Sequence, residues 1–128
     1  MVHRDNGTAL FESTLKSLVS KVDGALGAIF LDGDGEAVMW HTNGDSTQLR
    51  LRAAYVAVLV KTARSIASRL GNGTTTSLLI EYDNTQFLIE NLIKGYFVAL
   101  ELNKSANLAQ ALKQIRPVVD ILCKEIAA

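Results

Sequence analysis

The sequence predicts an α+β fold in which one five-stranded, mainly antiparallel sheet lies between helices. Hydrophobic periodicity along the 128 residues gives the order helix, two strands, long helix, three strands, helix. Neighbouring strands are linked by short turns, which require the strands to run antiparallel. The strands are almost continuously apolar, so helices are expected on both faces of the sheet.

The composition is that of a single domain over residues 1–128, with no linker, internal repeat or low-complexity segment. Apolar residues make up 48% of the chain and there is one proline, which argues against disorder. Thirteen basic and thirteen acidic residues cancel, so no overall charge favours nucleic acid. The single cysteine, Cys123, and the lack of a signal peptide predict a cytoplasmic protein. No apolar run approaches the roughly 20 residues of a membrane span.

A tail, a helix and a hairpin are predicted before the middle of the chain. Residues 1–7 are polar and contain Asn6-Gly7, which predicts a short loose tail. Thr8 can cap a first helix that extends to about Val22. A hairpin turn at Asp32–Gly35 then joins two strands, followed by a polar loop over residues 41–45; the strands are residues 25–31 and 36–40.

The longest predicted element is a central helix from Ser46 to Leu70, which has no glycine, proline or acidic residue. Asp45 or Ser46 can cap its start, and Gly71 follows its end. A wide apolar arc suited to covering a sheet comprises Leu49, Ala53, Val56, Leu59, Val60, Ala63, Ile66, Ala67 and Leu70. Further apolar residues occupy a flank that a monomeric helix would leave polar, namely Leu51, Tyr55 and Val58. A separate basic edge comprises Arg50, Lys61 and Arg64.

Three strands and a last helix are predicted after the central helix. The strands are residues 74–82, 86–92 and 96–102, joined by tight turns, and the helix is residues 108–128. Pro117 lies inside this helix and is expected to kink or split it. The strand over residues 74–82 follows a crossover and contains neither proline nor lysine, so it is expected at an undefended sheet edge.

The sequence contains no group of residues that predicts catalysis, a metal or a cofactor. Asp32–Glu36 resembles the start of a calcium loop but lacks the glycine and glutamate that an EF-hand needs further on. Gly71–Thr76 ends a helix, whereas a phosphate loop opens one. His3 and His41 have no cysteine pair with which to bind a metal. Three acids on consecutive strands are expected to balance basic side chains or face water: Glu81, Glu90 and Glu101.

An interaction surface is predicted instead. An undefended strand edge beside a helix with surplus apolar surface indicates a symmetric partner, a second copy of the chain. The expected dimer interface comprises Leu51, Tyr55, Val58, Ser77, Leu78, Leu79 and Ile80. The basic edge has no acid on the same helix to neutralise it, so it is either a solvated face or a surface for an acidic partner; its residues are Arg50, Lys61 and Arg64.

Three stretches of the chain have the order and spacing found in a known family. They are residues 23–32 with Gly35 in the turn, residues 78–100 from LLIEY to GYFVAL, and residues 107–111. Together with the order of elements they cover about residues 8–127. In these features the chain resembles the roadblock/dynein light chain 7 family and, more narrowly, its bacterial MglB-like members.

The resemblance implies a five-stranded antiparallel sheet in the order 2-1-5-4-3, with the central helix on one face and the N- and C-terminal helices on the other. It also implies a homodimer joined through the third strand and the central helix. Family members regulate or scaffold small Ras-like GTPases or act as adaptors on dynein-type assemblies. MglB-like members stimulate GTP hydrolysis by their partner without inserting an arginine finger, so no arginine here is assigned a catalytic role.

Three classes of function follow from these observations. The first is a homodimeric, non-enzymatic regulator of a small Ras-like GTPase. The second is a structural adaptor that does not affect GTP hydrolysis. The third is a small-molecule sensor of the PAS or GAF kind, which would need a ligand cavity inside one protomer; dense Leu and Val packing on both sheet faces argues against it. An enzyme is the least favoured interpretation.

Overall fold

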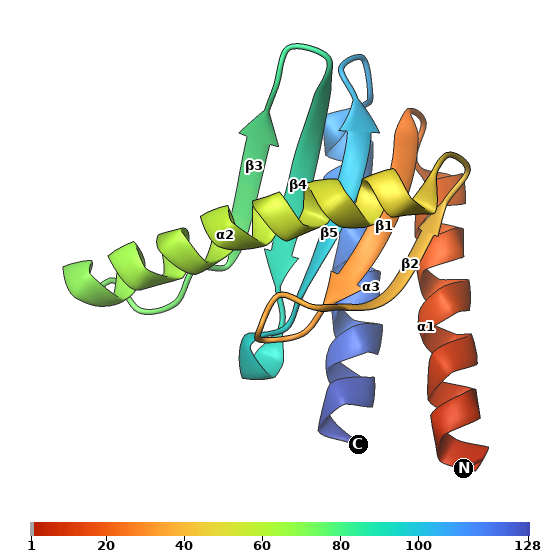
Figure 1. The fold of residues 1–128 in the computed structure, drawn as a ribbon, viewed down its shortest axis with the longest axis horizontal. Coiled ribbons are helices and arrows are strands. Elements are labelled where there is room, and N and C mark those ends of the chain that lie inside the picture. Colours follow the sequence, from red (N-terminus) through yellow and green to blue (C-terminus); the bar gives the residue numbers. More distant parts are fainter. Residues whose placement is uncertain (1) are drawn as a thin grey trace.

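The protein is a three-layer structure in which helices cover both faces of one sheet (Figure 1). The computed structural model describes the backbone of residues 2–128 and side chains from residue 7 onward. The elements are α1 (Val2–Lys21), β1 (Ala25–Leu31), β2 (Ala37–Thr42), α2 (Ser46–Leu70), β3 (Ser77–Glu81), β4 (Thr85–Asn91), the 3-10 helix η1 (Ile93–Gly95), β5 (Phe97–Asn103) and α3 (Leu108–Ala127).

All five strands belong to one antiparallel sheet in the order β2-β1-β5-β4-β3. α2 crosses one face of the sheet, whereas α1 and α3 lie on the other face (Figure 1). The predicted α+β fold, strand order and placement of the helices are therefore confirmed. β2 and β3 are the two edge strands, as the resemblance implies for β3.

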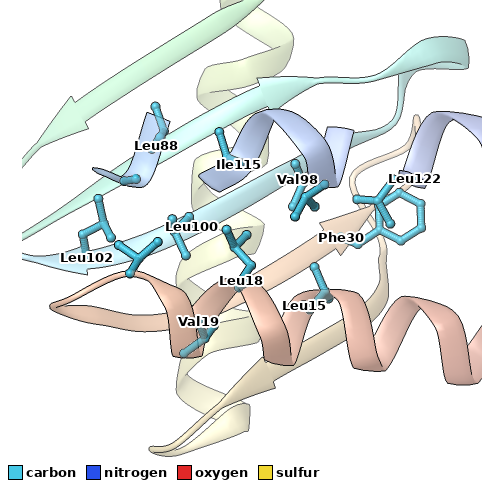
Figure 2. Packing of buried hydrophobic residues seen from close by; sticks show 14 residues of the cluster. Leu15, Leu18, Val19, Phe30, Leu88, Val98, Leu100, Leu102, Ile115 and Leu122 are labelled. Carbon is cyan, nitrogen blue, oxygen red and sulfur yellow. The ribbon is translucent and has the colours of Figure 1, made fainter. Parts of the chain in front are cut away.

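Each face of the sheet has its own hydrophobic core. Successive side chains of a strand point to opposite faces, so the central strands supply both cores and must be apolar almost throughout. Figure 2 shows the core beneath α1 and α3, which includes Leu15, Leu18, Phe30, Val98, Leu100, Ile115 and Leu122. The core beneath α2 joins Leu49, Ala53, Val56, Ala57 and Val60 to Ile29, Phe87, Ile89, Phe97 and Ala99.

α2 begins and ends at the predicted residues because capping groups fix both ends. The Asp45 side chain accepts hydrogen bonds from the backbone N–H groups of Thr47 and Gln48, at 2.9 and 3.3 Å. Gly71 is in the left-handed conformation with φ of 69° and donates to the carbonyl of Ser68. Asp45 and Gly71 are therefore the caps of α2, as the sequence predicts.

α2 is longer than the sheet beneath it is wide. Its 25 residues extend about 37 Å at 1.5 Å per residue, whereas five strands spaced about 4.8 Å apart place the outer strands about 19 Å from each other. α2 crosses the strands, so its last turns project past β3 (Figure 1). Its buried residues accordingly end at Val60.

The predicted apolar arc of α2 is therefore wrong in its second half. Ile66 and Leu70 are 52% and 66% exposed because the helix has passed the edge of the sheet. Leu59, at the margin of the arc, is also exposed, and Ala63 and Ala67 are only half-buried.

Other boundaries differ from the predictions at the ends of elements. α1 starts before Thr8, inside the segment predicted as a tail, because one glycine costs a helix only about 1 kcal/mol; Met1 lies outside the described residues. β2 extends to Thr42, which pairs with Gly27 of β1, and so includes part of the predicted loop. β3 is shorter than predicted, since residues 74–76 belong to the linker after α2.

α3 is a single helix that contains Pro117. The predicted split of this helix is therefore wrong. Pro117 lies on the exposed side of α3, where water can bond the backbone carbonyl that proline leaves without a partner.

Candidate functional site

An apolar stripe runs along the outer side of α2, opposite the residues that pack on the sheet. Spacings of three and four residues align its members on one side of the helix. We call it the outer stripe: Leu51, Tyr55, Val58, Leu59, Thr62, Ile66 and Leu70. The six apolar members are 45–70% exposed, and the Thr62 hydroxyl donates to the carbonyl of Val58 at 2.9 Å. The stripe thus presents a mainly apolar surface from Leu51 to Leu70, with Arg69 on the same side near its end.

The exposed edge of β3 lies at the same side of the molecule as the second half of α2 (Figure 1). β3 pairs only with β4, in the register Ser77 with Glu90 to Glu81 with Gln86. Leu78 and Ile80 are half-buried against the core beneath α2. Leu79 points to the opposite face, where it pairs with Leu88, and is 40% exposed.

The residues predicted as a dimer interface therefore form two neighbouring groups. Leu51, Tyr55 and Val58 lie on the outer stripe, and Ser77 to Ile80 lie on the edge strand. The structure adds Leu59, Ile66 and Leu70 to the first group, because these residues, predicted as core, are exposed on the same side of α2.

A partly buried ion pair joins the first half of α2 to β5. Glu101 is only 2% exposed. Its carboxylate accepts hydrogen bonds from Nε of Arg52 at 2.6 Å and from Nη2 at 2.8 Å. The hydrogen bond to Glu101 raises the pKa of the Arg52 guanidinium. A charged residue within an otherwise apolar central strand is the sequence signal that points to such a partner.

The three strand acids do not converge. Glu81 lies 3.5 Å from Lys104 Nζ, and Glu90 accepts from the hydroxyl of Ser77. Glu81 and Glu101 thus balance basic side chains, as expected, whereas the partner of Glu90 is a neutral hydroxyl.

The basic edge of α2 lies against β2, the β1–β2 turn and the end of β4. The Arg50 guanidinium lies 4.5 Å from the centre of the Trp40 ring. Lys61 Nζ donates to the carbonyl of Asp34 in the β1–β2 turn at 2.5 Å. Arg64 donates from Nε and Nη2 to Asn91 Oδ1, at 3.1 and 2.5 Å.

Charge on this edge is left without acidic partners. Within the described residues, none of Arg50, Lys61 and Arg64 forms an ion pair. Arg50 and Lys61 are exposed, whereas Arg64 is half-buried, and this burial lowers the pKa of its guanidinium. The structure thus places the three predicted residues on one side of α2 but gives Arg64 a different environment from the other two.

No metal centre or membrane span is found in the part of the chain that the structure describes. Its His, Cys, Asp and Glu side chains form no group of three that could hold a metal ion. None of its helices combines the length and apolar character that crossing a membrane requires.

Comparison with known proteins identifies the family. The profile of the Roadblock/LC7 domain matches residues 11–101, which is more than half of the chain. The chain therefore belongs to the Roadblock/LC7 family, in agreement with the resemblance seen in its sequence. A search among curated proteins finds no match.

Solved structures share the fold at low sequence identity. A Roadblock/LC7 domain from Streptomyces avermitilis has a TM-score of 0.83 and 21% identity, over 91% of this chain and 98% of that one. The gliding protein MglB of Thermus thermophilus has a TM-score of 0.82 and 14% identity, over 93% and 90%. MglB of Myxococcus xanthus has a TM-score of 0.84 and 12% identity, over 94% and 90%.

Proposed function

We propose that this chain is a homodimeric, non-enzymatic regulator of a small Ras-like GTPase and that it works in the cytoplasm. Membership of the Roadblock/LC7 family supports this class of function. The likeness to gliding proteins of the MglB type supports a regulatory role within the family. The observation that carries the proposal is the outer stripe beside the free edge of β3, because it supplies a large surface for protein contact.

A second copy of the chain fits both parts of this surface. Two β3 strands related by a two-fold axis can pair antiparallel and continue the sheet across the dimer. The second half of α2, which projects past β3, would then lie over the partner's sheet. In that arrangement the two α2 helices lie side by side and antiparallel, so that Ile66 and Leu70 of one helix can cover Leu51, Tyr55 and Val58 of the other. One interface thus accounts for the exposed strand edge and for the excess length of α2.

The basic edge offers a surface for the GTPase. Arg50, Lys61 and Arg64 lie on a side of α2 distinct from the outer stripe, so dimerisation leaves this edge accessible. Positive side chains without acidic partners suit an acidic patch on another protein and would speed its association. We assign the contact chiefly to Arg50 and Lys61, which are the more exposed of the three.

The alternatives differ in what they require of the protomer. A sensor of the PAS or GAF kind needs an internal ligand cavity, and both faces of this sheet are occupied by packed cores. A structural adaptor needs only the binding surface, so it is separated from a regulator by the rate of GTP hydrolysis.

The test uses small Ras-like GTPases from the same organism. We expect one of them to bind the wild-type chain and to hydrolyse GTP faster in a single-turnover assay when the chain is present. Arg50→Glu with Lys61→Glu should slow association by about tenfold at low salt and reduce its salt dependence. The control carries the same charge change on α3, on the other face of the sheet, as Lys113→Glu with Arg116→Glu.

Each outcome of this test has a distinct meaning. Binding without faster hydrolysis would identify an adaptor and contradict the regulatory proposal. Binding that both double variants slow equally would remove the basic edge from the interface. Failure to bind any such GTPase would contradict the proposed function.

A further inference from the structure

The second half of α2 forms one wall of a cleft of about 700 Å³. The other walls are the linker after α2, the end of β4 with η1, and one side chain of α3. The lining residues are Arg64, Ser68, Gly73, Thr74, Thr75, Thr76, Asn91, Leu92, Ile93, Lys94, Gly95 and Cys123. This lining contains two cationic side chains and four hydroxyl groups but no carboxylate.

Arg64 is a partly desolvated cation held only by neutral groups. Its Nε and Nη2 donate to Asn91 Oδ1, and Nη2 also approaches the carbonyl of Tyr96 at 3.4 Å. Burial lowers the pKa of this guanidinium, and no acid among the described residues forms an ion pair with it to compensate for the lost hydration. A charge withdrawn from water is stabilised most effectively by an opposite charge with matching hydrogen bonds.

Asn91 holds Arg64 in place and has one buried donor that no described residue uses. Its Oδ1 must face Arg64. If the amide were reversed, the NH₂ group of Asn91 would face the two N–H donors of Arg64 and no hydrogen bond could form. This orientation leaves Nδ2 buried and, within the described residues, without a hydrogen-bond partner. A buried donor without an acceptor is uncommon and calls for one nearby.

Lys94 brings a second positive charge from the opposite wall. It is the residue of η1 with a left-handed backbone, at φ of 57°. The turn holds it beside Gly95, whose Cα hydrogens face Arg64: a Cβ built there would lie 3.8 Å from Arg64 Nη1. The two cations therefore come from different elements and line one cleft.

We propose that this cleft is a binding site for an oxyanion, a phosphate or carboxylate group of a small ligand. Arg64 and Lys94 supply its charge complementarity, Asn91 holds the Arg64 guanidinium in place, and the hydroxyls of Ser68 and the threonines complete a polar lining. The apolar side chains of Leu92 and Ile93 accommodate the body of the ligand. All residues of this site come from one protomer, so it is tested separately from the proposed function.

Nuclear magnetic resonance titration of the full chain tests the proposal with inorganic phosphate and with acetate as probes, at constant ionic strength. We expect saturable shifts confined to residues 73–76, Asn91 and η1 with at least one probe, and their comparison separates a phosphate from a carboxylate site. Arg64→Gln should weaken binding by about tenfold or more, since it removes a charge-assisted contact.

Two further variants distinguish loss of anion binding from misfolding. Asn91→Asp keeps the shape of the side chain, pairs with Arg64 and introduces a negative charge, so it should abolish anion binding without lowering the melting temperature. Lys94→Asn keeps a residue that tolerates the left-handed conformation and should weaken binding.

The matched control is Arg116→Gln on α3, which does not line the cleft. It should leave the affinity for the probe unchanged. Absence of saturable shifts with both probes, or an equal loss of affinity in Arg116→Gln, would overturn the proposal. Binding that persists in Asn91→Asp would do the same.

Discussion

The two halves of α2 share one apolar periodicity but have opposite surroundings. From Ser46 to Val60 the helix lies over the sheet, and five of its residues are buried. From Lys61 to Leu70 no residue is buried, although Ile66 and Leu70 continue the apolar pattern. Periodicity therefore shows which residues of a helix can be buried, whereas the width of the sheet decides which of them are buried by the same chain.

Arg52 and Arg64 show the same contrast between the two halves of α2 in their charged interactions. Arg52 in the first half meets the buried carboxylate of Glu101 in a bidentate ion pair. Arg64 in the second half meets, among the described residues, the neutral oxygens of Asn91 and Tyr96 and the ring of Phe97, with no carboxylate. The pKa of Arg52 is raised by its partner and that of Arg64 is lowered by burial. The sheet-facing side of the first half of α2 is thus satisfied within the chain, whereas the second half has no such buried side.

Truncation of one apolar residue in each half should give the largest difference in stability between the two halves. Leu49→Ala should lower the free energy of unfolding by about 2–5 kcal/mol, because Leu49 is fully buried. Ile66→Ala should change it by about 0.5 kcal/mol or less in the monomer. Chemical denaturation, at concentrations where ultracentrifugation shows a monomer, measures both. Equal losses would mean that the second half is packed within the protomer.

Removal of the arginines should give a smaller but parallel difference. Arg52→Gln leaves the buried Glu101 without its cation and should cost about 2–3 kcal/mol, a value reduced because Arg52 is 44% exposed. Arg64→Gln should cost about 1 kcal/mol or less, since it removes hydrogen bonds together with an uncompensated charge. Thermal unfolding compares the two. Arg52→Met with Glu101→Leu is the control, which should recover stability by replacing the ion pair with apolar groups.

A charge on the outer stripe should affect dimerisation but not the folding of the protomer. Val58 is 61% exposed in the protomer, so Val58→Glu should leave folding unchanged within about 0.5 kcal/mol. In the proposed dimer it would bury a charge without a partner and weaken association by about tenfold or more. Sedimentation equilibrium measures the dissociation constant. Ser13→Glu on α1 is the control, and a wild-type chain that sediments as a monomer would contradict the proposed dimer.

Local chemistry made much of the fold predictable. The ends of α2 follow from Asp45 and Gly71, which lie beside the helix in the sequence and cap it directly. The hairpin between β1 and β2 follows from the Asp and Gly residues of its turn. The strand order needed the family resemblance, because apolar strands alone do not show which strands are neighbours.

The parts that were missed depend on residues distant in the sequence. Arg52 and Glu101 are separated by 49 positions, so no local pattern joins them. The cleft combines Arg64, Asn91 and Lys94 from three elements. The exposure of Ile66 and Leu70 depends on the number of strands beneath α2, which the helix sequence does not contain.

The strand order also determines when the sheet can be completed during synthesis. β1 and β2 form a local hairpin, and β3, β4 and β5 form a local meander. The centre of the sheet, however, pairs β1 with β5, so Leu31 meets Phe97. A chain that leaves the ribosome from its N-terminus carries an unpaired β1 until β5 has emerged. Joining β1 to β5 closes a long loop, and this step is expected to limit the folding rate.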